Sequence, residues 1–325
     1  MYDYFMEKLI YQMFILGTGE YLDYALYKGL GGVIFFTRDI FSSEQFKTLI
    51  TTIKSKSTIP PFLSIDQEGG RVERTENIHK RYLSPRHAYA KGEDFLHQQS
   101  ETIACELLEY GINLNFAPCA DVNTNPNNPI IGERAFSDNA QEVIKGVKIV
   151  SEEFRKNNII PCVKHYPGHG DADKDSHLTL PKIDLPLDVM ERIHIKPFEF
   201  AVKNNIEMIM AAHIHCTCFD NNVIPASLSK NAIGYLRNNL GYGGIIVSDD
   251  MVMKGVQDFG SVDAIIMGIE AGLDMFIFRD ADKNTVEALD KVVKIVEQNK
   301  DLKQKVLVSN HRIKNLKEKF NILHS

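Results

Sequence analysis

The sequence predicts a (β/α)8 barrel, in which eight parallel strands form a closed ring and helices cover the outside. Two observations predict it. Eight short apolar runs alternate with amphipathic segments along the chain, and ionisable residues gather directly after the runs. The alternative is an open, doubly wound sheet. No G-x-G-x-x-G follows any run, and the number of runs matches barrel closure, so we expect the barrel, with its functional site at the carboxyl ends of the strands.

The expected strands are short and apolar over their whole length, as is typical of parallel strands buried on both faces. In order, they are Gln12–Leu16, Gly32–Phe36, Pro61–Ile65, Asn113–Pro118, Ile159–Val163, Met208–Ala212, Gly244–Val247 and Asp274–Phe278.

The segments between these runs have helical periodicity. Ser42 with Gln45, and Asn139 with Glu142, have the spacing of a capping box, and Gly111 marks a helix end. The expected helices are Ser42–Ser57, Phe95–Tyr110, Asn139–Asn157, Leu187–Asn204, Ser229–Leu240, Ser261–Ala271 and Lys283–Gln298, with a last helix over Lys303–Phe320.

Length and composition favour one large domain. The 325 residues are 44% hydrophobic and 25% charged, which is enough for a sizeable core. No break in composition and no Pro-, Gly- or Ser-rich linker divides the chain. We therefore expect a single domain over residues 1–325, closed by the C-terminal helix, with no second domain.

Charge and cysteine content exclude several classes of partner and location. The net charge of -6 gives no electrostatic basis for binding nucleic acid or an anionic membrane. No run reaches the roughly 20 apolar residues of a spanning helix, and Asp3 and Glu7 stand where a secretion signal would be basic. Five cysteines without framework spacing indicate reduced thiols. These features predict a cytoplasmic protein.

The richest stretch follows the fifth apolar run and reads K-H-Y-P-G-H-G-D-A-D-K-D-S-H-L-T-L-P over Lys164–Pro181. Ionisable groups crowded on a loop after a strand pack poorly but are well placed for chemistry. We expect Gly168 and Gly170 to loosen this loop. In an extended segment Asp175 and His177 share a side, so the carboxylate can orient the imidazole as a general acid/base.

Other runs also end in polar residues. Asp66, Glu68, Arg71 and Arg74 follow the third, Asp121 and then Arg134 the fourth, His213 and His215 the sixth, and Asp249 and Asp250 the seventh. The amino ends of the same runs carry almost nothing ionisable. One polar mouth is thus expected at the carboxyl ends of the strands.

Within that mouth, Asp249 is expected to be a partly buried carboxylate. Because neighbouring strand side chains alternate, only one of Asp249 and Asp250 should face the mouth. The remaining groups provide several fixed donors and one carboxylate acceptor, which suits a ligand rich in hydroxyls and carbonyls, such as a sugar. They are Asp66, Arg74, Arg134, Lys164 and His165.

Three motifs carry a resemblance: I-D-Q-E-G-G-R-V-E-R, the K-H-Y-P-G-H-G-D block with D-S-H, and V-S-D-D-M. Over about Gly31–Asp280 the chain resembles the family 3 glycoside hydrolases, especially the single-domain bacterial β-N-acetylglucosaminidases of peptidoglycan recycling. The resemblance implies that Asp249 is the nucleophile, His177 the acid/base and Asp175 its partner. It implies that the five residues above bind the non-reducing N-acetylglucosamine.

The implied reaction is hydrolysis with retention through a covalent glycosyl-aspartate. The expected substrates are muropeptide fragments of the type GlcNAc-anhydroMurNAc. We expect no cofactor, no metal and no obligate protein partner.

Four alternatives stay open. A histidine acid does not repel anions as a carboxylate would, so phosphate could replace water and the enzyme would be a phosphorylase. Substrate-assisted cleavage would use Asp249 and Asp250 as a pair. A metal-dependent hydrolase would draw on His213, His215, Cys216, Cys218 and Asp249. The last alternative is a sugar-binding module without activity.

Overall fold

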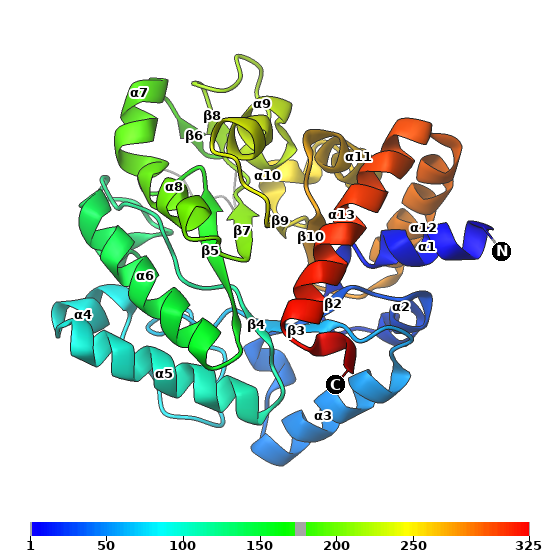
Figure 1. The fold of residues 1–325 in the computed structure, drawn as a ribbon, viewed down its shortest axis with the longest axis horizontal. Coiled ribbons are helices and arrows are strands. Elements are labelled where there is room, and N and C mark those ends of the chain that lie inside the picture. The colour runs from blue at the N-terminus through cyan, green and yellow to red at the C-terminus, as the bar shows by residue number, and fades with distance from the viewer. Residues whose placement is uncertain (1, 173–179, 325) are drawn as a thin grey trace.

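The computed structural model describes residues 2–172 and 180–324. Eight parallel strands form a closed barrel in the order β1-β10-β9-β7-β5-β4-β3-β2, with helices around it (Figure 1). The predicted barrel is therefore confirmed. Its strands are β1 (Phe14–Leu16), β2 (Gly32–Phe35), β3 (Phe62–Ile65), β4 (Leu114–Asn115), β5 (Ile160–Tyr166), β7 (Met208–Ala211), β9 (Ile245–Asp250) and β10 (Met275–Phe278).

The strand boundaries differ from the prediction where polar residues begin. β5 and β9 extend beyond their apolar runs into Lys164–Tyr166 and Ser248–Asp250, because neighbouring strands still pair with them there. β4 is shorter than the expected Asn113–Pro118. The regular strand ends at Asn115, whose side chain bonds the backbone of Gln67, although Cys162 and Lys164 still donate to the backbone oxygens of Ala117 and Pro118.

Six of the expected helices are present as continuous helices and cover the barrel. Ser42 and Asn139 accept hydrogen bonds from the first turns of α3 and α6, as N-caps do. Gln45 does not complete a capping box, because its side chain bonds the backbone N–H of Phe41. The helices are α3 (Ser43–Lys56), α5 (Glu93–Glu109), α6 (Ala140–Lys156), α11 (Ser261–Ala271), α12 (Lys283–Gln298) and α13 (Lys300–Lys319).

Two expected helices are interrupted. Leu187–Asn204 consists of α7 (Leu187–Val189), a π-helical turn at Met190–His194 and α8 (Lys196–Lys203). Pro197 lacks the N–H that a continuous helix would need there. Ser229–Leu240 changes from α9 (Lys230–Gly234) to a π-helical turn just after Gly234.

The sequence prediction missed several short elements. They are the helices α1 (Tyr2–Tyr11), α2 (Leu22–Lys28), α4 (Pro85–Ala90) and α10 (Lys254–Gln257), and the two-stranded sheet of β6 (Lys182–Ile183) and β8 (His215–Cys216). Within the described residues, no helix is both long and apolar enough to cross a membrane.

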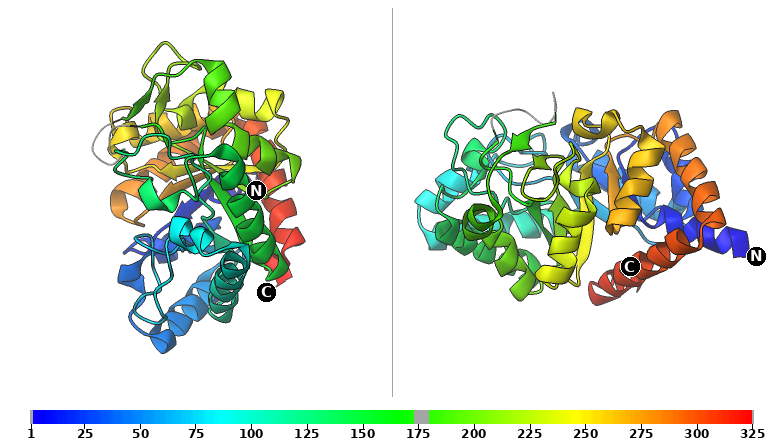
Figure 2. Two further views of the ribbon diagram at one scale, coloured as in Figure 1. Left: turned by 90° about the vertical axis from the view of Figure 1, so that its left-hand side faces the viewer. Right: turned by 90° about the horizontal axis from the view of Figure 1, so that it is seen from above.

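The amino end of the barrel is closed by α13, which runs along the lower side of the right-hand view in Figure 2. Ser309 and Arg312 of this helix donate to Asp274, and Lys317 donates to Gln12 and to the backbone oxygen of Pro60. The amino end of the barrel therefore also holds ionisable groups. Asp274 and Glu207 lie just before β10 and β7, and helices bring cationic side chains to both.

Candidate active site

A cavity of ≈ 520 Å³ opens at the carboxyl ends of the strands. It is lined by six predicted site residues, Asp66, Arg74, Arg134, Lys164, His165 and Asp249. Further polar lining comes from Arg71, His169, Asp250 and Arg279, and apolar lining comes from Ile34, Phe36, Val72, Pro129, Ile130, Met210, Met253 and Ile277. The barrel thus brings together residues from Ile34 to Arg279, which are 245 positions apart in the sequence.

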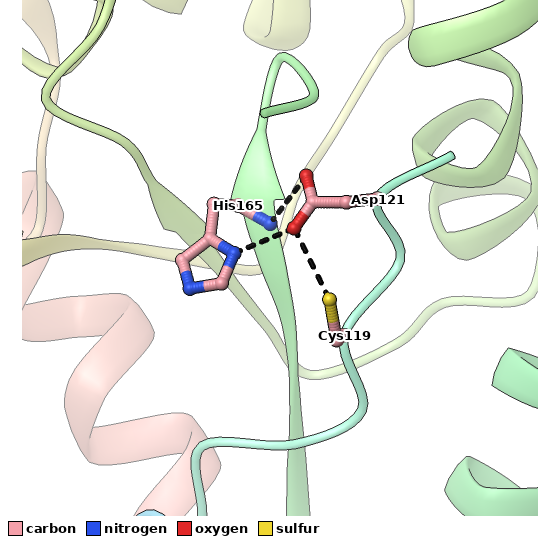
Figure 3. Close-up of side chains that lie close together, drawn as sticks. All are labelled: Cys119, Asp121 and His165. Carbon is pink, nitrogen blue, oxygen red and sulfur yellow. Dashed lines mark hydrogen bonds and ion pairs between the residues drawn. The ribbon is translucent and has the colours of Figure 1, made fainter. Parts of the chain in front are cut away.

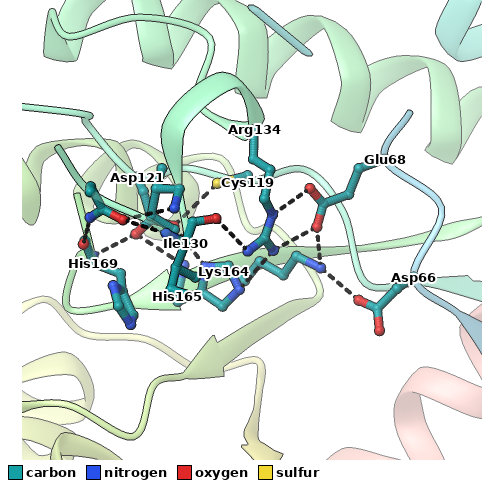
Figure 4. A network of polar contacts seen from close by, with 11 residues as sticks. Asp66, Glu68, Cys119, Asp121, Ile130, Arg134, Lys164, His165 and His169 are labelled. Atoms are coloured by element: carbon teal, nitrogen blue, oxygen red, sulfur yellow. Dashed lines mark hydrogen bonds and ion pairs between the residues drawn. The ribbon is translucent and has the colours of Figure 1, made fainter. Parts of the chain in front are cut away.

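One wall of the cavity is a buried ionic network, shown in Figure 4. Lys164 Nζ lies 2.6 Å from Asp66 Oδ1 and 2.6 Å from Glu68 Oε1. Arg134 grips both oxygens of Glu68, from Nε at 2.9 Å and Nη2 at 2.8 Å. Burial alone would raise the pKa of Glu68, but Arg134 and Lys164 outweigh it and hold that pKa well below its usual range.

The network holds the site's donors in place before any ligand binds. Arg134 Nη2 also lies 3.2 Å from His165 Nε2, which extends the connected groups from β3 to β5. Asp66 is half-buried and uses Oδ1 for Lys164, so its other oxygen is available to the cavity. Fixed groups of this kind are what recognition of a hydroxylated ligand requires.

Behind this wall, Asp121 is a hydrogen-bond centre (Figure 3). Its carboxylate lies 2.7 Å from His165 Nδ1 and 3.1 Å from Cys119 Sγ, and it accepts from the backbone N–H of His169 at 2.6 Å. Burial would raise the pKa of Asp121, but the adjacent His165 lowers it overall. Asp121 thereby fixes the orientation of the His165 ring that faces the cavity.

Cys119, Asp121 and His165 are also the one group of three or more potential metal ligands that converges in the described part of the chain. Its chemistry does not favour a metal. Burial and the charge of Asp121 raise the pKa of the Cys119 thiol well above its usual value, and a metal ligand must lose its proton. The three groups instead satisfy one another.

The metal alternative raised from the sequence involved other residues, and the structure separates them. His213 lies 2.7 Å from Ser227 Oγ and 3.1 Å from the backbone oxygen of Asp250. His215 lies in β8 and contacts the backbone oxygen of Ile224 at 3.4 Å. These histidines are held by neighbouring protein groups and do not form a common ligand set with the cysteines.

Asp249 and Asp250 both line the cavity, so the expectation that only one of them faces the mouth is wrong. The reason lies in the strand register. Val247 pairs with Met275 and Asp250 with Ile277, so β9 has one residue more than β10 over this interval. Such a bulge breaks the strict alternation of side chains and is common beside active sites.

The two carboxylates nevertheless differ in their surroundings. Asp250 forms an ion pair with Arg279 and accepts from the N–H groups of Val252 and Arg279. Asp249 accepts only the N–H of Asp250, at 2.8 Å, among the described residues. Asp249 is therefore the carboxylate left free for a ligand.

Their pKa values also diverge. Burial raises the pKa of Asp250, with partial compensation from Arg279. Burial acts in the same direction on Asp249, but His165 and His213 outweigh it and lower the pKa below the ordinary value. Asp249 is thus ionised at neutral pH, as a nucleophilic carboxylate must be.

Near the cavity mouth, Arg74 and Arg71 present guanidinium groups. Arg74 lies over the Phe36 ring at 5.8 Å, and its buried Nε has no hydrogen-bond partner. Arg71 donates to the backbone oxygen of Pro129 at 2.9 Å. Among the described residues neither guanidinium forms an ion pair, so both can serve a ligand.

Sequence reasoning assigned no individual role to Glu68, Asp121, His169 or Arg279, although Glu68 and His169 lie in the quoted motifs and Asp121 follows the fourth apolar run. The predicted acid/base pair, Asp175 and His177, lies outside the described residues.

The expected loosening by Gly168 and Gly170 is not what the structure shows. Gly168 has a φ of +121°, and a Cβ at Gly170 would lie 1.8 Å from the backbone oxygen of Val122. Glycine is therefore needed here for tight packing.

A barrel whose mouth holds an ionised carboxylate among fixed hydrogen-bonding groups is compatible with glycoside hydrolysis. Comparison with known proteins gives the family. Residues 19–316 match the glycosyl hydrolase family 3 N-terminal domain, and the chain belongs to this family.

Similar curated proteins include beta-hexosaminidase A of Pseudoalteromonas piscicida, 34% identical over 319 residues, which cover 89% of this chain and 53% of that protein. The beta-hexosaminidase of Neisseria gonorrhoeae is 31% identical over 258 residues, covering 76% and 71%. The chain thus spans about half the length of the first relative and somewhat more than two thirds of the second.

Solved structures agree with the fold. A family 3 β-N-acetylglucosaminidase from Paenibacillus superposes with a TM-score of 0.92 at 29% identity, over 97% of this chain and 62% of that one. The β-N-acetylhexosaminidase of Beutenbergia cavernae gives 0.89 at 24% identity, over 96% and 98%. The second likeness concerns the fold alone.

Proposed function

We propose that this protein is a retaining exo-β-N-acetylglucosaminidase that uses Asp249 as its nucleophile. The observation that carries the proposal is the state of Asp249, which is ionised, free of protein cations in direct contact, and placed at the cavity. The names of the family 3 relatives support the choice of a β-linked N-acetylhexosamine.

The buried network explains how the sugar would be held. Lys164 is held by Asp66 and Glu68, and Arg134 is held by Glu68, so these groups lose little freedom when they bind hydroxyls. His165 and Arg74 line the same cavity and add further polar groups. A non-reducing sugar gripped in this way would present its anomeric carbon to Asp249, which converts a bimolecular attack into a positioned one.

In the first half-reaction Asp249 Oδ attacks the anomeric carbon, and the bond to the leaving oxygen breaks as that oxygen takes a proton. In the second, the group that gave this proton acts as a base and takes a proton from water. The water releases the sugar from the aspartyl ester, and configuration is retained. We assign this proton transfer to His177 with Asp175 as its partner, on the basis of the sequence motif. General acid/base catalysis of this kind contributes about 10²–10⁴-fold.

The leaving group and the location are part of the same proposal. We expect a disaccharide or muropeptide of the GlcNAc-anhydroMurNAc type and a cytoplasmic site of action. All five cysteines are free thiols, which supports a reducing compartment. We also propose that the 325-residue barrel suffices for activity.

The test is hydrolysis of a chromogenic β-N-acetylglucosaminide by the wild type, Asp249→Ala and Asp249→Asn. Loss of the nucleophile should lower kcat by more than about 10³-fold. A 2-fluoro sugar, which lacks the acetamido group, should trap a covalent ester on Asp249 that mass spectrometry locates. The matched control is Asp250→Asn, which removes a carboxylate from the same strand end and should allow trapping at position 249.

Each alternative predicts a different result. Rate acceleration by inorganic phosphate with formation of a sugar 1-phosphate would make the protein a phosphorylase. Failure to trap, with full activity on the N-acetyl substrate, would indicate substrate assistance. Loss of activity with a chelator would revive the metal alternative, and an inactive wild type would leave a binding module.

A further inference from the structure

His169 is a buried cavity residue whose two ring nitrogens have no hydrogen-bond partner in the described part of the chain. Its side chain lines the cavity, only 2% of the residue is exposed, and neither ring nitrogen forms a hydrogen bond. In Figure 4 no dashed line reaches its ring. Buried polar atoms are nearly always hydrogen-bonded, so a ring with two unsatisfied nitrogens in a cavity wall indicates a ligand.

The position of the ring is nevertheless well defined. The backbone N–H of His169 donates to Asp121 Oδ1 at 2.6 Å, and its carbonyl accepts from Asn128 Nδ2 at 2.8 Å. The ring meets that of His165 edge-on, with 6.2 Å between centroids. The residue is therefore held in advance by its neighbours, while both nitrogens are left to something else.

The charge state of the ring limits what that ligand group is. Burial lowers the pKa of His169 to about 4, so the imidazole is neutral at pH 7. A neutral imidazole offers one N–H donor and one acceptor nitrogen. It therefore suits a neutral group that can both donate and accept, and it does not favour a carboxylate or a phosphate.

The location favours one part of the sugar. His169 lies within electrostatic reach of Asp249, whereas the cations Lys164 and Arg134 are bound to Asp66 and Glu68. Asp249 marks the anomeric carbon, and the carbon next to it carries the 2-substituent. An acetamido group there is neutral and has both an N–H and a carbonyl oxygen.

We propose that His169 is a specificity-determining residue that hydrogen-bonds the 2-acetamido group of the bound N-acetylglucosamine. This inference rests on the proposed function. It assigns to His169 the discrimination between an N-acetylglucosaminide and the corresponding glucoside, which carries a hydroxyl at the same carbon.

The experiment compares wild type and His169→Phe on 4-nitrophenyl β-N-acetylglucosaminide and 4-nitrophenyl β-glucoside, which share one leaving group. Phe keeps the ring and removes both nitrogens. We expect the ratio of kcat/KM for the two substrates to fall by about tenfold or more, since the amide is left without its partner. His169→Gln, which restores a donor and an acceptor, should recover part of the ratio.

A second readout does not require turnover of the glucoside. The inhibition constants of free N-acetylglucosamine and free glucose are measured against the N-acetyl substrate. In His169→Phe the constant for N-acetylglucosamine should rise by about tenfold, while the constant for glucose stays within about twofold.

His194→Phe is the matched control. His194 is also buried with an unpartnered ring nitrogen, but it does not line the cavity. Its substitution should leave the kcat/KM ratio and the two inhibition constants unchanged. The melting temperatures of His169→Phe and His194→Phe show whether packing is affected.

The outcomes separate this inference from the proposed function. If the wild type cleaves the N-acetyl substrate but His169→Phe loses activity equally on both substrates, or keeps the wild-type ratio, the role of His169 is refuted and the proposed function stands. If the wild type fails to cleave the N-acetyl substrate, the proposed function fails first.

Discussion

Both ends of the barrel bury a carboxylate between two cationic side chains, Asp274 at the amino end and Glu68 at the carboxyl end. Asp274 is fully buried between Arg237 and Arg312 and also accepts from Ser309 and the N–H of Ile246. Glu68 is gripped by Arg134 and Lys164.

The two ends differ in what surrounds these pairs. Arg237 also donates to the backbone oxygens of Tyr242 and Gly244, and α13 covers the network. At the carboxyl end, Arg74 Nε and both nitrogens of His169 have no partner in the described part of the chain, and they line an open cavity. A buried ionic network by itself therefore does not indicate function, whereas unsatisfied groups around such a network do.

The largest effects are expected when the same carboxylate-to-amide change is made at each end of the barrel. Asp274→Asn leaves Arg237 and Arg312 without their counter-charge, so the free energy of unfolding should fall by about 3–5 kcal/mol. Specific activity at 25 °C should stay within about twofold of wild type. Urea denaturation and kcat/KM measure the two effects, and a large loss of kcat/KM in fully folded protein would contradict the comparison.

Glu68→Gln is the counterpart at the carboxyl end. It should cost somewhat less stability, about 2–3 kcal/mol, because Lys164 keeps Asp66 and the cavity admits water. It should also lower kcat/KM by at least about tenfold, since Lys164 and Arg134 lose the anchor that orients them. Full activity of this variant would show that the network is as purely structural as the one around Asp274.

Lys317 makes the stability of the amino end depend on pH. Its amine is buried at the amino end on Gln12 and Pro60, and burial lowers its pKa from the ordinary 10.5 to about 7. Below pH 7 the amine is charged in both states, and the cost of burying the charge is fully present.

Between pH 7 and 10.5 the unfolded chain retains a proton that the folded chain has released. Stability should therefore rise with pH by up to about 1.4 kcal/mol per unit relative to Lys317→Met, which lacks the group. Urea denaturation of both proteins at pH 6, 8 and 9.5 measures the difference. A pH-independent difference would mean that Lys317 keeps its charge inside the protein.

The smallest effect is expected from Lys319→Met, also at the amino end. Lys319 is more than half exposed, and its partner Glu207 keeps both bonds to Arg155. The loss should be about 0.2–1 kcal/mol and should shrink in high salt. A loss above 2 kcal/mol would show that the amino-end network depends on its exposed members as well.

The alternation of apolar runs and amphipathic segments was enough to predict the barrel. Each run is buried on both faces and is therefore apolar over its whole length, and this can be recognised without knowing which strands lie beside it. The rule that parallel strands direct their carboxyl ends to one face then placed Asp66, Lys164 and Asp249 together. Local pattern was sufficient wherever burial alone sets the structure.

Only the tertiary structure decided features that depend on register and on distant partners. The bulge that turns both Asp249 and Asp250 into the cavity arises from pairing between β9 and β10. The buried charges at Asp274 come from Arg237 and Arg312, which lie far from it in sequence. Whether a polar side chain such as His169 has a hydrogen-bond partner depends on which atoms lie within hydrogen-bond distance of it. The linear sequence does not give the distances between residues that are far apart in the chain.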